Sequence, residues 1–176
     1  KLNKILGNNF FKKKINFKLN SSLESQIASI SDDIAYNSHD LEDGLKSNLF
    51  NLNHLSNIPV LNKIISNHTK RLKNHSIDLV IRQIIREIIN EMVSDVINTT
   101  KKNIKIYKIK NLNNIYKTKE QIVTFSDEMK KFDKKIKNFL KQKMYFHKSV
   151  NSNTNYGKKV LTKLFFEIKK NPKKYI

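Results

Sequence analysis

Apolar residues recur at helical spacing over most of the chain. In the first such segment they follow one another at intervals of three, four or seven residues. They are Leu23, Ile27, Ile30, Ile34, Leu41 and Leu45. This spacing predicts a helix with one buried stripe that ends between Gly44 and Asn48. At its start, Ser21 and Glu24 have the spacing of a capping box, in which the serine caps the helix and the glutamate reaches back to it.

The most apolar segment extends from Ile77 to Ile97. Its apolar residues cover a wide face, which is typical of a helix in the centre of a core. They are Ile77, Val80, Ile81, Ile84, Ile85, Ile88, Ile89, Met92, Val93, Val96 and Ile97.

The other helices are predicted from local start and stop signals. Residues 51–59 indicate a short helix or turn, and Pro59 suits the first turn of a helix that extends to about His68. Ser126 is expected to cap a helix that extends to about His147. A last helix from 153 or 154 to 170 is expected to stop at Asn171-Pro172. Between these helices, residues 100–123 form a linker with room for a short extended piece.

Composition supports an all-α fold. The 176 residues suit one domain, and they contain only three glycines and two prolines. Residues 1–20 are basic and irregular, and we predict that they form a connector. The lack of cysteine excludes disulfides and thiolate metal sites, and it indicates a reducing, cytoplasmic setting. No apolar run reaches the ~18 residues of a membrane span, so no membrane association is expected.

The strong positive charge has two explanations. The formal net charge is +20, from 35 lysines and arginines against 15 aspartates and glutamates. Nucleic-acid binding is one explanation. The other, which we favour, is compositional bias, because the chain is rich in Lys, Asn and Ile and its lysines do not alternate with aromatic residues as in a stacking platform. In either case some attraction for polyanions, including nucleotides, is expected.

Negative charge is nevertheless concentrated between Ser21 and Asn57. This segment holds one basic residue, Lys46, and the carboxylates of Glu24, Asp32, Asp33, Asp40, Glu42 and Asp43. On a helix, Asp32, Tyr36 and Asp40 lie four residues apart and project from one side, with His39 near the same line. Carboxylates beside an imidazole suit a divalent metal, and a tyrosine can donate to a phosphate oxygen. A solvated acidic face is the alternative, and spacing alone does not exclude it.

The stretch LESQIASISDDIAYNSHDLEDGL, residues 23–45, resembles a helix of the bacterial deoxyguanosinetriphosphate triphosphohydrolase-like proteins, in the HD superfamily of metal phosphohydrolases. The matching residues are Leu23, Glu24, Gln26, Asp32, Asp33, Ile34, Ala35, Tyr36, His39, Asp40, Asp43, Gly44 and Leu45. The resemblance continues over residues 85–97, 125–147 and 158–176. Ser31 stands where alanine is common, and residues 101–120 match poorly.

The resemblance implies a role for three positions. Asp32 corresponds to the distal aspartate ligand of a divalent metal, with Mg²⁺ or Mn²⁺ expected. Tyr36 corresponds to a tyrosine that contacts the triphosphate, and Asp40 to the aspartate that recognises the deoxyribose 3′-hydroxyl. Position 33 often carries lysine in relatives, so Asp33 puts a phosphate contact there in doubt.

The His39-Asp40 dipeptide is not the HD metal pair that the resemblance implies, because it follows the distal ligand on the same helix. The other histidines, at 54, 68, 75 and 147, lack the right context. We therefore expect the first His and the His-Asp pair to lie upstream of Lys1. On this interpretation residues 21–57 end the catalytic domain, and residues 58–176 are a C-terminal helical region of the same enzyme.

The function implied is metal-dependent hydrolysis of a deoxynucleoside triphosphate to deoxynucleoside and inorganic triphosphate, by a homo-oligomer. The isolated chain is expected to be inactive, and no residue is assigned as a general acid or base. The alternative is a non-catalytic basic helical module that binds nucleic acid or a partner subunit.

Two further groups of residues have a structural and a functional interpretation. Arg82 and Arg86 can contact phosphates. We favour salt bridges with nearby carboxylates on the same helix, those of Glu87, Glu91 and Asp95. Residues 144–147 are predicted to be core and a helix end rather than a base-binding cluster.

Overall fold

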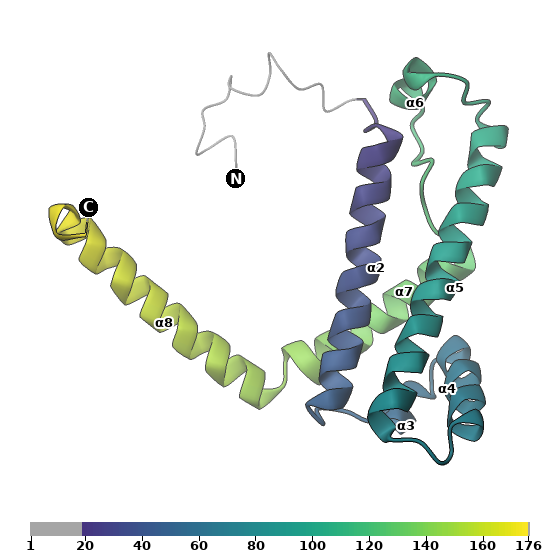
Figure 1. Cartoon of the computed structure of the whole chain (residues 1–176). Coiled ribbons are helices and arrows are strands. Elements are labelled where there is room, and N and C mark those ends of the chain that lie inside the picture. Colours follow the sequence, from purple (N-terminus) through teal and green to yellow (C-terminus); the bar gives the residue numbers. More distant parts are fainter. Residues whose placement is uncertain (1–18, 176) are drawn as a thin grey trace. The chain divides into compact units, whose positions relative to one another are not determined.

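The computed structural model describes residues 19–175, which form helices joined by turns (Figure 1). The α-helices are α2 (Leu23–Lys46), α3 (Leu52–Leu55), α4 (Pro59–Arg71), α5 (Ile77–Ile106), α6 (Leu112–Lys117), α7 (Asp127–Leu140) and α8 (Lys148–Lys170). A π-helical turn, η1 (Lys141–Tyr145), follows α7, and a 3₁₀ turn, η2 (Pro172–Lys174), follows α8. No strand occurs within residues 19–175, so the predicted all-α class is confirmed. Most of the predicted connector, residues 1–18, lies outside the described residues.

The chain divides into two compact units. Among the described residues, the first contains 19–38 and 86–130, and the second contains 39–85 and 131–175. Helices α2, α5 and α7 each contribute a segment to both units. The boundary predicted at residue 57 between catalytic and C-terminal regions concerns function, and it stays a prediction.

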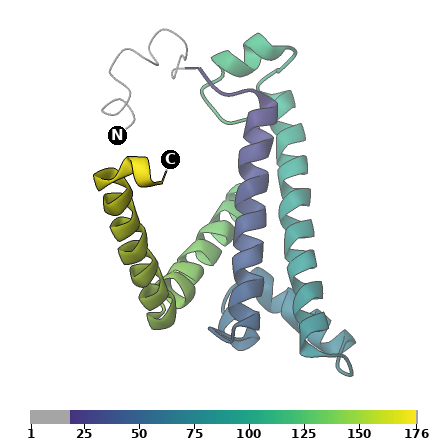
Figure 2. The same cartoon turned by 60° about the vertical axis from the view of Figure 1, so that its left-hand side comes forward.

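In the first unit, segments of α2 and α5 lie side by side in both ribbon views (Figures 1 and 2). The buried apolar residues of this unit are Ile34, Ile88, Met92, Val96, Ile115, Ile122, Val123 and Phe125. Gln26 is also buried, and its Oε1 accepts hydrogen bonds from the backbone N–H groups of Ile122 and Val123, at 2.9 and 3.0 Å. One side chain of α2 thus satisfies two buried donors in the segment that precedes α7.

Helix α2 begins one residue later than the capping prediction. The cap is Ser22, whose Oγ accepts from the N–H of Ser25 at 3.3 Å. Ser21 is engaged differently, since its carbonyl accepts from Gln26 Nε2 at 2.8 Å. The Glu24 carboxylate is engaged at Ser22 and not at the predicted Ser21: hydrogen bonds from its own backbone N–H and from the Ser22 hydroxyl hold the pKa of its carboxyl below the ordinary value.

The segment predicted as a linker is largely helical. Helix α5 extends to Ile106, nine residues beyond the predicted end at Ile97, and α6 follows it. At the end of α5, Lys108 has a φ of 50°, and the N–H of Ile109 donates to the carbonyl of Ile104 at 3.0 Å. This is a left-handed cap that satisfies the last carbonyls. The extended piece expected in this segment is absent from residues 100–123.

In the second unit, α7 buries Phe132, Ile136 and Leu140, which are spaced four residues apart. The other buried apolar residues of the unit are Leu41, Leu45, Phe50, Leu55, Ile58, Leu61, Ile64, Ile65, Val80, Ile81, Ile84 and Ile85. Ser126 caps α7 as predicted, by accepting from the N–H of Met129 at 3.2 Å. The predicted helix to about His147 is interrupted, because the α-helix ends at Leu140 and the π turn follows it.

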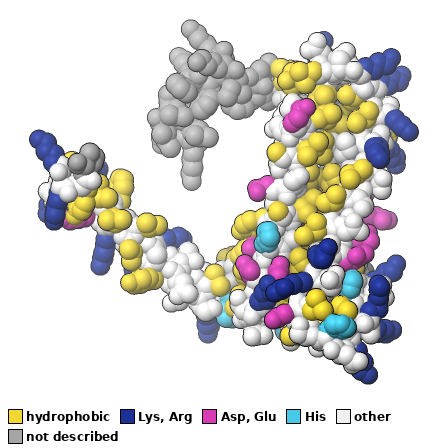
Figure 3. Space-filling view, in the orientation of Figure 1, with side chains coloured by type: hydrophobic (Ala, Val, Ile, Leu, Met, Phe, Trp, Pro, Cys, Tyr) yellow, Lys and Arg dark blue, Asp and Glu magenta, His cyan; other side chains and the backbone are white. Residues whose placement is uncertain are grey.

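Helix α8 begins at Lys148, five or six residues before the predicted start, and ends at Lys170 as predicted. It has no buried residue. Its exposed apolar side chains include those of Leu161, Phe165 and Phe166, and Figure 3 shows hydrophobic side chains at the surface along it. Within residues 19–175, no helix has both the length and the apolar character to cross a membrane.

Several residues of the predicted apolar stripes are exposed. Ile27 of α2 is 50% exposed, and on α5 Ile77 is 61% exposed and Ile97 is 47% exposed. Val93 is exposed as well. The burial predicted for these residues is therefore wrong, whereas that of Ile34, Leu41 and Leu45 is confirmed. Periodicity identifies an apolar face of a helix, but it does not determine whether another element covers that face.

Candidate functional site

The candidate residues of the acidic segment all lie on α2, which continues without a break through them. Asp32 and Tyr36 belong to the first unit, one helical turn apart, and both are exposed. Tyr36 is 58% exposed, although an aromatic side chain usually gains stability from burial. An exposed tyrosine next to an exposed carboxylate is free to meet a ligand.

His39 and Asp40 belong to the second unit. His39 is exposed, whereas Asp40 is half-buried. The Asp40 carboxylate accepts a hydrogen bond from the phenol hydroxyl of Tyr145, the last residue of the π turn η1. This contact joins residues 105 positions apart in the chain.

The sequence prediction missed Tyr145 as a partner of Asp40. It assigned residues 144–147 to the core and a helix end. In the structure Met144 and Tyr145 are half-buried, Phe146 is 61% exposed and His147 is exposed, so the core assignment is wrong for the last two. No local pattern signals a contact over this separation, because it depends on how the whole second unit packs.

The metal-binding capacity of the described residues is limited. No group of three or more His, Cys, Asp or Glu gathers within the part of the chain that the structure describes. Asp32 is a single exposed carboxylate, which fits one position in the coordination of a hard divalent cation but does not complete a site.

Arg82 and Arg86 of α5 are exposed. Among the ion pairs of residues 19–175, none joins either arginine to Glu87, Glu91 or Asp95, so the favoured salt bridges are not formed. Asp95 has other partners: its two carboxylate oxygens accept from the backbone N–H and from the hydroxyl of Ser126, at 2.8 and 2.6 Å. The two guanidinium groups keep their donors for other partners.

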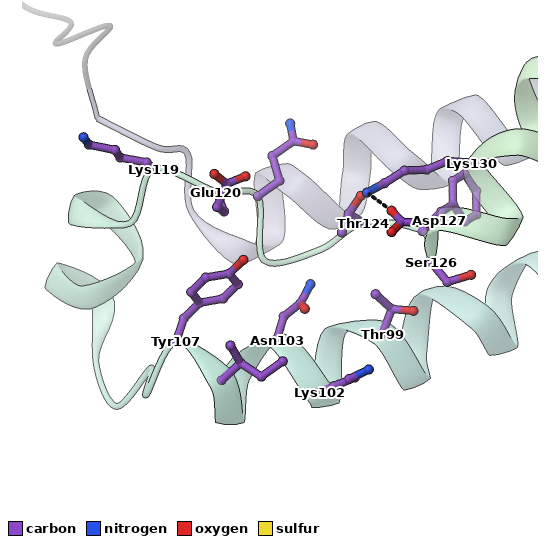
Figure 4. Close-up of a pocket in the computed structure, with 13 residues that line it drawn as sticks. Thr99, Lys102, Asn103, Tyr107, Lys119, Glu120, Thr124, Ser126, Asp127 and Lys130 are labelled. Atoms are coloured by element: carbon purple, nitrogen blue, oxygen red, sulfur yellow. Dashed lines mark hydrogen bonds and ion pairs between the residues drawn. The ribbon is translucent and has the colours of Figure 1, made fainter.

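A second feature of the first unit is a cavity of about 550 Å³ beside the end of α5 and the start of α7 (Figure 4). Three ammonium groups and four hydroxyl groups line it, from Lys102, Lys119, Lys130, Thr99, Tyr107, Thr124 and Ser126. Two carboxylates, those of Glu120 and Asp127, also line it, and Asp127 pairs with Lys130 at 3.3 Å. The opposite charges partly offset one another, so the lining favours no single ligand class. The sequence pattern did not indicate this cavity.

Comparison with known proteins identifies the family. A model described as a phosphohydrolase-associated domain matches residues 123–175, which contain α7 and α8. A deoxyguanosinetriphosphate triphosphohydrolase-like protein of Pelagibacter ubique is 45% identical over 175 residues, which is 99% of this chain and 47% of that protein. Over nearly its whole length, the chain is similar to members of the deoxyguanosinetriphosphate triphosphohydrolase-like family.

Other members of this family show the same partial coverage. The protein of the same name from Bartonella tribocorum is 35% identical over 86% of this chain and 38% of its own length. That of Neorickettsia sennetsu is 33% identical over 82% of this chain and 37% of its own length. The chain thus spans less than half the length of these curated relatives. Their names and the matching family model identify a phosphohydrolase family.

Proposed function

We propose that this chain is part of a deoxynucleoside triphosphate triphosphohydrolase, in which α2 forms one wall of the substrate site. The reaction is hydrolysis of the substrate to deoxynucleoside and inorganic triphosphate. The observation that supports this proposal most directly is the similarity, over 99% of the chain, to a protein named deoxyguanosinetriphosphate triphosphohydrolase-like.

The three candidate residues of α2 have side chains that suit the roles proposed for them. Asp32 contributes one oxygen ligand to a divalent cation, Mg²⁺ or Mn²⁺, whose other ligands come from outside the described residues. Such a cation offsets negative charge on the phosphates and lowers the pKa of bound water. Tyr36 donates its hydroxyl to a triphosphate oxygen, and Asp40 accepts from the 3′-hydroxyl of the deoxyribose. We also propose that the full-length protein is a homo-oligomer and acts in the cytoplasm.

Two features suit a triphosphate substrate: the arginines of α5 and the positive net charge of the chain. Arg82 and Arg86 are exposed and form no ion pair with the neighbouring carboxylates of α5 among the described residues. Guanidinium groups match phosphate oxygens in two-point hydrogen bonding. The net charge of +20 adds a long-range attraction for a polyanionic substrate.

The test uses the complete product of the gene that encodes this chain. It is incubated with each deoxynucleoside triphosphate and Mg²⁺ or Mn²⁺, and released triphosphate and deoxynucleoside are separated by anion-exchange chromatography. Release of both products in equal amounts is expected. Release of monophosphate and diphosphate instead, or no turnover with any of the substrates, would contradict the proposal.

The net charge also favours a second candidate, a basic helical module that binds nucleic acid. The same preparation would then bind single- or double-stranded DNA with an affinity that falls steeply as salt rises. Binding of this kind in a protein that releases no triphosphate would favour the second candidate.

A further inference from the structure

We propose that Tyr145 is a positioning residue, which orients the Asp40 carboxylate for recognition of the sugar 3′-hydroxyl. This inference rests on the proposed function. It starts from the hydrogen bond that the Tyr145 hydroxyl donates to Asp40 Oδ2. A bond from a neutral donor to an ionised carboxylate is stronger than one between neutral groups, and both partners are half-buried, so water competes for it only partly.

The π turn places Tyr145 at this point. Its wider hydrogen bond runs from the N–H of Phe146 to the carbonyl of Lys141, at 3.1 Å. A π turn accommodates one extra residue, which rotates the following side chains by about 100° relative to an uninterrupted α-helix. Single π turns of this kind frequently occur at functional sites.

Packing in the second unit holds α7, and therefore η1, against the end of α2. Phe50 is buried and lies against Gly44 of α2. Its ring also contacts the ring of Phe139 in α7 edge to face, with centroids 4.8 Å apart and an interplanar angle of 83°. Phe50 thus connects Gly44, four residues after Asp40, with Phe139, six residues before Tyr145.

The consequence for Asp40 follows from its two oxygens. The Tyr145 hydroxyl engages Oδ2, which restricts rotation of the carboxylate and leaves Oδ1 as its second acceptor. Without the phenol hydroxyl the carboxylate can rotate and is solvated more freely. Recognition of the 3′-hydroxyl then weakens, whereas steps at the phosphates are unaffected.

The experiment uses the complete gene product and the variants Tyr145→Phe, Asp40→Ala and the double variant. For deoxynucleoside triphosphates, Tyr145→Phe is expected to raise KM about tenfold and to change kcat less than about twofold, since it removes one charge-assisted hydrogen bond. For a 2′,3′-dideoxynucleoside triphosphate, which lacks the 3′-hydroxyl, it is expected to change neither constant. Tyr156→Phe is the matched control, because Tyr156 is 72% exposed on α8.

The double variant distinguishes a positioning role from a separate one. If Tyr145 acts through Asp40, the change Tyr145→Phe has no further effect on KM once Asp40 is alanine. Independent, additive effects would overturn the inference, and so would an equal loss with the dideoxy substrate. An effect confined to thermal unfolding would assign Tyr145 a purely structural role.

A readout without turnover separates this inference from the proposed function. A double-mutant cycle on urea unfolding is expected to show coupling between positions 145 and 40. Absence of coupling overturns the contact itself, whatever the activity. Coupling in a protein that releases no triphosphate overturns the proposed function and the recognition role together, and leaves only a structural bond.

Discussion

Phe50 occupies the space that a side chain at Gly44 would fill. A Cβ built at Gly44 overlaps two atoms of the Phe50 ring, although Gly44 lies within helix α2, where glycine is usually unfavourable. The helix ends two residues later, and the left-handed cap is Asn48, with a φ of 54°. Glycine at position 44 is therefore required by close packing rather than by helix termination.

The first prediction concerns this contact. Gly44→Ala is expected to lower the free energy of unfolding by about 1–3 kcal/mol, because Phe50 is buried against Phe139 and cannot move away without disturbing that pair. Gly157→Ala is the matched control: no atom lies within 4 Å of a Cβ there, and alanine favours the helix by up to about 1 kcal/mol. Urea unfolding of both variants measures the difference. Equal effects at the two positions would contradict the role of the Phe50 contact.

The second prediction concerns Gln26. Gln26→Ala leaves the buried N–H groups of Ile122 and Val123 without their acceptor, so a loss of about 2 kcal/mol or more is expected. The rate of amide hydrogen exchange should increase more at these two residues than in the centre of α5. Gln121→Ala is the control, because this glutamine is exposed. Unchanged exchange at Ile122 and Val123 would show that the Gln26 bonds are not formed in solution.

Local signals predicted the helices well where a cap or a stop is a property of neighbouring residues. Ser126 starts α7 through a bond to Met129, three residues on, and Asn171-Pro172 ends α8. The extension of α5 to Ile106 was missed. It is supported partly by a distant contact, in which Asn103 Nδ2 donates to the carbonyl of Ile122 at 2.9 Å. A prediction from helix propensity over a short stretch of sequence does not include a hydrogen bond of this kind.

The same limit applies to the candidate site. The residues on α2 could be selected because their spacing and their resemblance to a family motif are local. Tyr145 could not, because its partner Asp40 is 105 positions away and a π turn directs the side chain. The exposure of Ile27 and Ile97 was also not predictable, since burial depends on the elements that cover a face.

The third prediction concerns pH and Glu24. The pKa of its carboxyl is lowered from the ordinary value by hydrogen bonds from its own backbone and from Ser22. The resulting stabilisation of the start of α2 is fully present above the pKa that Glu24 has in the unfolded chain. It is lost as the pH falls through the lower pKa that Glu24 has in the folded protein. Glu24→Gln should therefore have a lower free energy of unfolding than wild type at pH 7. This difference should be smaller at pH 3. Unfolding of both proteins in urea at the two pH values measures this.

Glu91→Gln is the control for Glu24, because it removes an exposed carboxylate in the middle of α5. A pH dependence of the same size in this variant would show that overall charge, and not the bond to the cap, causes the effect.

The fourth prediction is that the 176 residues alone release no triphosphate from any deoxynucleoside triphosphate. Within residues 19–175 no three potential ligands come together, and one carboxylate does not hold a catalytic cation. The purified chain is assayed with Mg²⁺ and with Mn²⁺ beside the complete gene product. Clear turnover by the chain alone would require a metal site among its own residues.

The last prediction separates the roles of Asp32, Tyr36 and Asp40 in the complete gene product. Asp32→Ala should abolish activity with loss of bound metal, because no neighbouring group replaces a coordinating carboxylate. Tyr36→Phe should raise KM with the metal content unchanged, since it removes only a hydrogen bond to the triphosphate. Asp40→Ala should also keep the metal, and it should reduce the preference for substrates that carry a 3′-hydroxyl, because the carboxylate that pairs with this group is gone.

Metal content by mass spectrometry, measured beside kcat and KM, decides between these roles. Glu91→Gln serves as the control for loss of an exposed carboxylate, and it should leave metal content and kinetics unchanged. If Asp40→Ala lost the metal while Asp32→Ala kept it, the two assignments would be reversed. The His39-Asp40 dipeptide would then be a metal-binding pair, and the hydrogen bond from Tyr145 would orient a metal ligand instead of a sugar contact.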